Sequence, residues 1–523
     1  MRSSFPRPSL ISETLSLLHK CTLKKDLTEG RALHATLIHQ GLDSIPFWAD
    51  HLIRLFTSCR SLVESNRVFL RVSRPSIYTW NAIISAHVNL GDPDNVFSLY
   101  ETMMKSIVEN AKRECGAMDK MKNINRECCS GPDRVMLLSL LKCCGLNASR
   151  RRYVHHQVVL HGLESDVVVA SALVDINAKC GSLRDALKLF KGLHPKDVVS
   201  WAVLMTGYIQ HEFHLMALNL FEDMKIEGVK PDRVIYLCIV KACGHTQILE
   251  LGRLIHTEII KDGLEEDLTI ANTLIDMYAK CGAIESARDV FESLPVRNVM
   301  SWNAMIGGYT QYGMCEEALK CFRQMQGDGI CPDALTYVCI LKACAIIGAL
   351  EIGEDIDIEA RKQRLLPKDV VLGASLVDMY AKCGALEKAR EVFEQLPMRS
   401  VVSWTALMAG YADHGLCDEA LKCFEQMRVE GVCPDVVTYA CILKACSIIG
   451  SLKIGEDIDF EVQQNGLLQQ DAILGASLVD MYSKCGALEK ARKVFERLPV
   501  RDVVSWCALM GGYGHLGQAK VVL

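Results

Sequence analysis

The 523-residue chain is half hydrophobic and contains only 14 prolines, a composition that indicates an ordered, core-forming protein rather than a disordered one. Its formal net charge of −5 lacks the basic surplus typical of nucleic-acid-binding proteins, so any such function would need a local basic groove. The chain has no CxxC spacing and no run of 18 apolar residues, which argues against a zinc site of the usual kind and against a membrane span.

The N-terminal stretch MRSSFPRPSLIS contains two Arg, four Ser and no acidic residue. This composition is typical of an organelle transit peptide, although the stretch is very short for one. It is a weak signal for import into a mitochondrion or chloroplast.

Beyond this stretch the chain repeats itself. Five tryptophans each follow a Ser or Thr in phrases such as VVSWTALM, and the last three intervals between them are 101, 102 and 102 residues. These tryptophans are Trp80, Trp201, Trp302, Trp404 and Trp506. Cysteines recur in register with them, closing phrases such as ILKAC and YAKC. We interpret the tryptophans as filling the seams between repeats and the cysteines as small packing thiols rather than metal ligands.

Each period contains three unequal repeats, for example residues 401–435, 436–471 and 472–502. Counting backwards gives fourteen complete repeats and a fifteenth that is partial. The chain therefore divides into a short N-terminal tail (1–10), two repeats (11–76), one repeat with an inserted loop near 105–130 (77–133), eleven regular repeats (134–502) and a partial repeat (503–523). The insertion is charged and lacks the repeat pattern, which predicts a surface loop or a short extra helix; an artefact of how the coding sequence was assembled remains the alternative.

Each repeat has the pattern of a helical hairpin. In residues 370–400, two apolar stripes with spacings of three and four are separated by Cys383-Gly384, and Pro397 follows the second stripe. The stripes consist of Leu376, Met379 and Tyr380, and of Leu386, Ala389, Phe393 and Leu396. One hairpin cannot bury both stripes, so neighbouring hairpins must stack. The sequence therefore predicts an all-α fold, a solenoid of stacked helical hairpins.

The repeats resemble the pentatricopeptide repeat (PPR) family of land plants, in particular its PLS class of alternating P, L and S motifs. The phrases that carry the resemblance are VVSWTALMAGYADHGLCDEALKCFEQMRVEGVCPD, VVTYACILKACSIIGSLKIGEDIDFEVQQNGLLQQD and AILGASLVDMYSKCGALEKARKVFERLPVRD. The resemblance implies a right-handed superhelix, similar to tetratricopeptide arrays, that binds single-stranded RNA at about one base per repeat. It implies no cofactor and no catalytic residue, because the chain has no PCxxC motif and so lacks the C-terminal E/DYW deaminase extension of that class.

In this family the fifth and last residues of a P or S motif contact the base edge, and the second residue wedges against the base. The resemblance therefore implies these base-reading pairs: Asn81 with Asp133 and Asn303 with Asp333 for uracil, Ser171 with Asp197 and Thr405 with Asp435 for guanine, and Asn272 with Asn298 for a pyrimidine. It implies these base-wedging residues: Tyr78, Val168, Val199, Thr269, Met300 and Val402. Several repeats depart from the pattern with Ala at the fifth position, so the implied target NNUNGNNYUNNGNN is a loose one.

These features predict a non-catalytic specificity factor for organellar RNA modification (C-to-U editing-site recognition) or other RNA maturation. Its partners would be single-stranded RNA and a deaminase or editing-complex protein supplied in trans, with no membrane. One alternative is a protein-binding helical-repeat scaffold, which the net charge of −5 favours. Another is a truncated relic of an editing factor.

Overall fold

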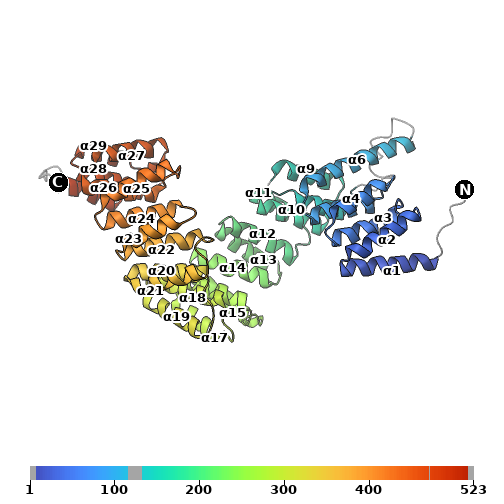
Figure 1. The fold of residues 1–523 in the computed structure, drawn as a ribbon, viewed down its shortest axis with the longest axis horizontal. Helices are drawn as coiled ribbons and strands as arrows, with labels where there is room; N and C mark the ends of the chain where they lie inside the picture. Colours follow the sequence, from blue (N-terminus) through green and yellow to red (C-terminus); the bar gives the residue numbers. More distant parts are fainter. Residues whose placement is uncertain (1–7, 116–131, 146, 470, 516–523) are drawn as a thin grey trace. The chain divides into compact units, whose positions relative to one another are not determined.

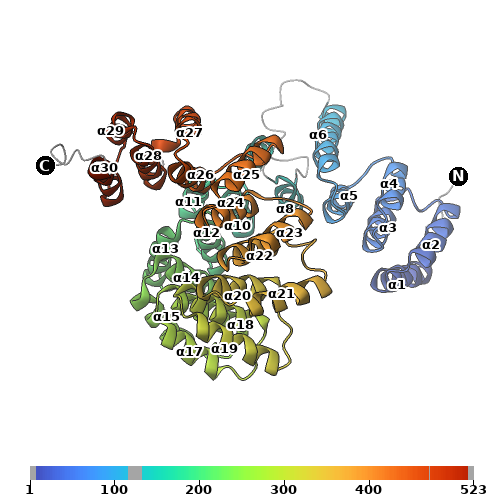
Figure 2. The same cartoon turned by 60° about the vertical axis from the view of Figure 1, so that its left-hand side comes forward.

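The computed structural model describes residues 8–115, 132–145, 147–469 and 471–515, and the regular elements within them are helices (Figure 1). The chain separates into two compact units, unit 1 (Met1–Ala242) and unit 2 (Cys243–Leu523). Within each unit consecutive helices form helical hairpins, and the hairpins follow one another in chain order, as Figure 2 shows for α18 to α29 of unit 2. The predicted all-α fold of stacked helical hairpins is thereby confirmed.

Two sets of helices make up unit 1, and the helix α14 (Arg233–Thr246) passes from it into unit 2. The first helices of the pairs are α1 (Pro8–Lys24), α3 (Pro46–Ser58), α5 (Ile77–Asn89), α8 (Arg134–Cys143), α10 (Val167–Lys179) and α12 (Val198–Gln210). The second helices are α2 (Leu27–His39), α4 (Leu62–Arg71), α6 (Pro93–Cys115), α9 (Ala148–Leu160), α11 (Leu183–Lys191) and α13 (His214–Ile226).

Unit 2 has the same organisation, with one short 3₁₀ turn, η2 (Leu467–Gln469). Its first helices are α16 (Leu268–Lys280), α18 (Val299–Gln311), α20 (Ala334–Ile347), α22 (Val370–Lys382), α24 (Val401–Asp413), α26 (Val436–Ile449), α28 (Ala472–Lys484) and α30 (Val503–His515). Its second helices are α15 (Leu249–Lys261), α17 (Ile284–Ser293), α19 (Cys315–Gly327), α21 (Leu350–Lys362), α23 (Leu386–Gln395), α25 (Cys417–Val429), α27 (Leu452–Gln464) and α29 (Leu488–Arg497).

First helices pack on their own second helices and, within each unit, on one another in chain order. In unit 2 this gives a continuous row in which α16, α18, α20, α22, α24, α26, α28 and α30 contact one another in turn. In unit 1 the corresponding row runs from α1 through α3, α5, α8 and α10 to α12. The first helices of each unit therefore share one face, on which residues at equal positions of successive repeats lie in line.

Local signals in the sequence explain where the helices end. Gly384 adopts φ +79°, so the chain turns out of α22 at the predicted Cys-Gly step, where a side chain would be strained. The second helix α23 then runs from Leu386 to Gln395, two residues before Pro397.

Tryptophans fill the seams between consecutive repeats. Trp404 is fully buried and meets Phe393 edge to face, with ring centroids 4.5 Å apart. Trp80, Trp201 and Trp302 are buried in the same way, which confirms the sequence-based interpretation for four of the five. Trp506 keeps its edge contact with Phe495 but is 47% exposed.

The predicted insertion coincides with a longer second helix. The helix α6 extends to Cys115, and the rest of the insertion near 105–130 falls largely on residues 116–131, outside the described residues. Most of the transit-like N-terminus (1–7) and the end of the partial repeat (516–523) also lie outside them. Among the helices that the structure describes, none is long and apolar enough to cross a membrane.

Candidate nucleic-acid interface

From residue 46 onwards, the second residue of each repeat, near the start of its first helix, is exposed to solvent. The apolar members of the predicted wedge set are between 44% and 65% exposed, and Thr269 is exposed as well. The five apolar members are Tyr78, Val168, Val199, Met300 and Val402. Large apolar side chains displayed at one position of successive repeats form a ladder on which planar groups could stack.

The last residue of each repeat serves as the N-cap of the first helix in the next repeat. In all five predicted pairs, its side-chain oxygen accepts a hydrogen bond of 2.8–3.0 Å from the backbone N–H three residues later. These caps are Asp133, Asp197, Asn298, Asp333 and Asp435. The cap holds the carboxylate or amide at the boundary between two first helices.

The structure joins three of the five predicted pairs directly. Asn81 Nδ2 donates to Asp133 Oδ2 at 2.6 Å, although the two residues lie 52 apart in the chain. Asn303 Nδ2 donates to Asp333 Oδ1 at 3.0 Å. The Asn272 Nδ2 group lies 3.4 Å from Asn298 Oδ1, which makes this the weakest of the three contacts.

The fourth pair is joined through a residue that the sequence analysis did not consider. Thr405 Oγ1 lies 2.8 Å from Thr438 Oγ1, and Thr438 Oγ1 donates to Asp435 Oδ1 at 2.7 Å. Its counterpart Thr336 lies 2.6 Å from Asn303 Oδ1 in the same way. The signal for both threonines was present in the sequence, because Asp-x-x-Thr at a helix start is the pattern of a capping box.

The fifth pair is not joined. No hydrogen bond links Ser171 to Asp197, and the Ser171 hydroxyl is buried without a partner among the described residues. The Oδ1 atoms of Asn81 and Asn272 are in the same state. Asp50 Oδ1, at the same repeat position, is also without a partner among the described residues. Buried polar atoms without partners are rare in proteins, which makes this position a candidate for contact with a ligand.

The pKa of one cap carboxylate is shifted by its surroundings at the joint, the boundary between the first helices of two consecutive repeats. Burial raises the pKa of Asp333, but hydrogen bonds from the Thr336 backbone, Asn303 and the Thr336 hydroxyl outweigh it, and the net result is a lowered pKa. The carboxylate is therefore ionised at neutral pH and orients the Asn303 amide.

Two grooves run along the first helices, one in each unit. In unit 2 a groove of about 770 Å³ is lined by second, fifth and last residues of the final repeats, including Ile473, Ala476 and Asp502. In unit 1 a groove of about 440 Å³ is lined by Asn81 together with Arg54 and Arg60. Of the predicted base-reading residues, Asn81 lines the unit 1 groove, whereas the unit 2 groove is lined by the equivalent positions of later repeats.

In the part of the chain that the structure describes, no three His, Cys, Asp or Glu residues are grouped as metal ligands. Burial raises the pKa of the Cys144, Cys243, Cys344 and Cys446 thiols to about 12, so these thiols stay protonated. They pack inside the first helices, as the sequence analysis expected.

Comparison with protein-family models identifies the repeats. The "PPR repeat family" model matches residues 196–245, 297–346 and 399–447. The "PPR repeat" model matches residues 78–107, 269–299, 375–401 and 477–503.

The chain is also similar to curated plant proteins over nearly its whole length. It is 32% identical over 495 residues to the chloroplastic pentatricopeptide repeat-containing protein At4g18520 of Arabidopsis thaliana, covering 94% of this chain and 76% of the relative. It is 32% identical over 561 residues to the mitochondrial pentatricopeptide repeat-containing protein At3g09040 of the same plant, covering 98% of this chain but only 54% of the relative. The chain thus spans three quarters of one relative and about half of the other.

Solved structures show the same fold. The crystal structure of the pentatricopeptide repeat protein PPR10 from maize matches with a TM-score of 0.60 and 17% identity, covering 97% of this chain and 71% of that one. PPR10 in complex with an 18-nt psaJ RNA element matches with a TM-score of 0.59 and 15% identity, covering 98% and 86%. Together with the relatives and the matched repeats, this shows that the chain belongs to the pentatricopeptide repeat protein family of plants.

Proposed function

We propose that the chain binds single-stranded RNA along its first helices, reads about one base per repeat, and belongs to the PLS class. The observation that carries this proposal is the joint between repeats. There, an exposed apolar second residue stands beside a fifth residue whose amide is held by the cap of the next helix, as at Asn81 with Asp133.

The hydrogen-bonding state of the joints suits base discrimination. When Asn81 Nδ2 donates to the Asp133 carboxylate, its buried Oδ1 remains as a fixed acceptor. A fixed acceptor favours a base edge that donates, such as the N3–H of uracil, over cytosine, whose N3 accepts. The Tyr78 ring, 63% exposed, would stack on the same base and supply affinity that does not depend on sequence.

The base assignments are those implied by the family resemblance. Asn81 with Asp133 and Asn303 with Asp333 would read uracil, Ser171 with Asp197 and Thr405 with Asp435 guanine, and Asn272 with Asn298 a pyrimidine. In repeats whose fifth residue is Ala, such as Ala476 in the unit 2 groove, the base would be held without being read. The target is therefore NNUNGNNYUNNGNN, with one letter for each of the fourteen complete repeats.

The setting that fits is organellar RNA maturation, including recognition of C-to-U editing sites, with the chain as a non-catalytic specificity factor for a deaminase supplied in trans. The relatives named above are chloroplastic and mitochondrial proteins, which supports residence in one of these organelles. The complex of maize PPR10 with an RNA element supports RNA as the ligand class.

The test compares two RNAs of 14 nucleotides, one carrying the target and one with its U and G positions exchanged. We expect the target to bind more tightly, and Thr405→Asn to shift the preference at its twelfth nucleotide from guanine towards uracil. The shift should be about fivefold or more, the ~1 kcal/mol scale of one hydrogen bond. Thr405→Ser, which keeps the hydroxyl, is the matched control and should retain guanine.

Equal, weak and salt-sensitive binding to both RNAs would contradict base reading. In that case the alternative of a protein-binding scaffold, or of an inactive relic, would become the better account of the repeats.

A further inference from the structure

The ninth and thirteenth residues of each first helix lie on the same stripe as the second and fifth, because their spacings are three and four. In four of the five L repeats (134–166, 233–267, 334–369 and 436–471) the ninth residue is a lysine, and all four of these lysines are exposed; in the first L repeat (11–45) it is His19. The four lysines are Lys142, Lys241, Lys342 and Lys444. This regular cationic position is unexpected in a chain whose net charge is −5.

Four of the five S repeats (167–197, 268–298, 370–400 and 472–502) also carry a lysine on this stripe, at the thirteenth residue, but each is neutralised within its own helix; the first S repeat (46–76) has Arg54 at the ninth residue and Ser58 at the thirteenth. An aspartate at the ninth residue forms an ion pair of 2.7–2.8 Å with the lysine one turn later. The pairs are Asp175–Lys179, Asp276–Lys280, Asp378–Lys382 and Asp480–Lys484. These lysines add no net charge to the face.

The four L-repeat lysines differ in whether they form an ion pair. The difference depends on the thirteenth residue of the preceding P repeat (77–133, 198–232, 299–333 or 401–435). In three P repeats this residue is uncharged: Asn89, Gln210 or Gln311. The lysines that follow them, Lys142, Lys241 and Lys342, form no ion pair with any described residue. In the fourth P repeat this residue is Asp413, whose Oδ1 accepts from Lys444 Nζ at 2.6 Å. This hydrogen bond raises the pKa of Lys444.

The Lys444–Asp413 pair lies in the groove itself. Both residues line the same 770 Å³ groove as the second residue Val437 and the fifth residue Ala440 of the L repeat. A phosphate linking two bases that stack on second residues would pass beside this position. At this position the Asp413 carboxylate already binds the Lys444 ammonium group, as a phosphate would.

Given that RNA binds along the first helices, we propose that the L repeats hold its phosphates through Lys142, Lys241 and Lys342, and that Asp413 occupies the equivalent phosphate position at Lys444. The L repeats, which have apolar fifth residues, would thus position the RNA backbone once per three repeats instead of reading bases. In the fourth triplet of P, L and S repeats (401–502), a phosphate must displace Asp413 before it can bind Lys444, so this contact adds little to the affinity for RNA. Backbone contacts of this kind set affinity and salt dependence without setting sequence preference.

The experiment uses the full chain and the 14-nucleotide target RNA, with dissociation constants measured between about 50 and 300 mM salt. Lys342→Gln should weaken binding about threefold and reduce the slope of log K against log salt by about 0.7, the contribution of one phosphate contact on a single strand. The double variant Asp413→Gln/Lys444→Gln removes the ion pair of the next triplet without changing the net charge, so it should leave affinity and slope nearly unchanged. Neither should alter the base preference.

Asp413→Gln reproduces the residue found at Gln311 and provides the converse test. It should raise affinity about threefold and steepen the slope by about 0.7, and adding Lys444→Gln should abolish both gains. Because the side chains of Lys342, Lys444 and Asp413 reach solvent, thermal unfolding midpoints should change little and serve as the folding control.

Equal losses from Lys342→Gln and from the double variant Asp413→Gln/Lys444→Gln, or no gain from Asp413→Gln, would overturn this inference while leaving base reading intact. The expected slopes without any base preference would sustain the phosphate sites and overturn base reading. A chain that binds neither RNA would overturn both.

Discussion

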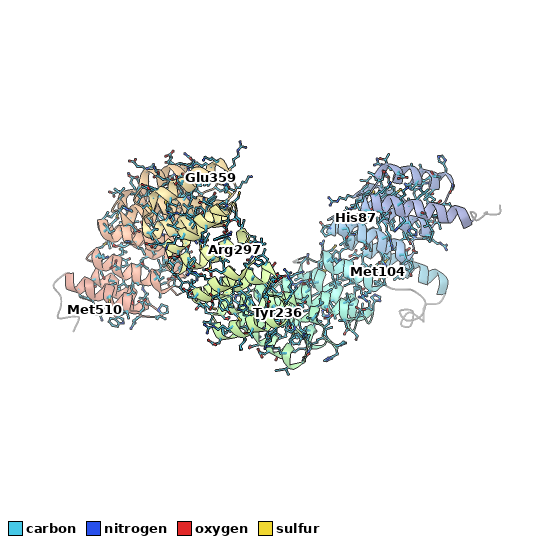
Figure 3. All side chains as sticks on the ribbon, turned by 90° about the horizontal axis from the view of Figure 1, so that it is seen from below. His87, Met104, Tyr236, Arg297, Glu359 and Met510 are labelled. Carbon is cyan, nitrogen blue, oxygen red and sulfur yellow. The ribbon has the colours of Figure 1, made fainter. Side chains whose placement is uncertain are left out.

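Residues 299–400 and 401–502 hold two consecutive triplets with nearly the same scaffold and different grooves. Trp302 and Trp404 are both buried and meet Phe291 and Phe393 edge to face at 4.8 and 4.5 Å. Arg297, which Figure 3 labels, lies 4.7 Å from the centre of the Phe291 ring, and Arg399 lies over Phe393 in the same way.

The differences concentrate on the face of the first helices. Asn303, bonded directly to its cap, is replaced by Thr405, which reaches its cap through Thr438. Gln311 is replaced by Asp413, which pairs with Lys444. Seam residues recur because every hairpin must bury the same apolar surface against the next, whereas groove residues can change without loss of packing.

The largest expected effect tests whether the two scaffolds are equivalent. Trp404→Ala should lower the free energy of unfolding by about 3–5 kcal/mol, because it empties a buried aromatic site, and Trp302→Ala should cost the same within about 1 kcal/mol. Urea titration followed by circular dichroism would measure both. Trp506→Ala, at a site 47% exposed, is the control and should cost distinctly less. A large difference between Trp302 and Trp404 would show that the twin triplets do not share one scaffold.

A smaller effect is expected at Gly308, where α18 packs closely against α16 of the preceding repeat. A Cβ atom on Gly308 would lie 2.6 Å from Ala279 Cβ, so Gly308→Ala should destabilise by about 1–3 kcal/mol.

The neighbouring Gly307 is the matched control, because a Cβ there would meet only Cys339 Sγ, at 3.8 Å. The fourth triplet already has alanine at this position, Ala409. Gly307→Ala should therefore be neutral or stabilise by up to about 1 kcal/mol, since alanine suits a helix better than glycine. Equal destabilisation by both substitutions, measured by urea titration, would contradict close packing at Gly308.

The smallest effect concerns the cap at the Asn303 joint. Asp333→Ala should cost about 1 kcal/mol through loss of the N-cap, whereas Asp333→Asn keeps a capping oxygen. Because the folded-state pKa of Asp333 is lowered, its stabilising effect is present above the unfolded pKa of about 3.9 and is lost as pH falls through the folded value.

As the pH falls below about 4, the unfolding midpoint of the native chain should therefore fall relative to that of Asp333→Asn. Thermal scans from pH 6 to pH 3 would follow it, since the asparagine does not titrate. A difference that stays constant over this range would mean that the carboxylate does not need its charge at this joint.

The local elements could be predicted from the sequence because each is specified within one repeat. Apolar spacing predicted the two helices of residues 370–400, the Cys-Gly step predicted the turn at Gly384, and the VSW phrase predicted the buried tryptophans. Trp506 is the exception, because it is 47% exposed.

The pairing across joints required the tertiary structure. The same resemblance implied five equivalent pairs, yet Asn81 bonds its cap directly, Thr405 does so through Thr438, and Ser171 does not. Likewise, nothing local to Lys444 distinguishes it from Lys342. Helix periodicity decides which face a residue occupies, but its partner lies about thirty residues away and is chosen by how two hairpins stack. The amino-acid pattern therefore determined the hairpins and the shared face, and the stacking of the hairpins decided which side chains meet there.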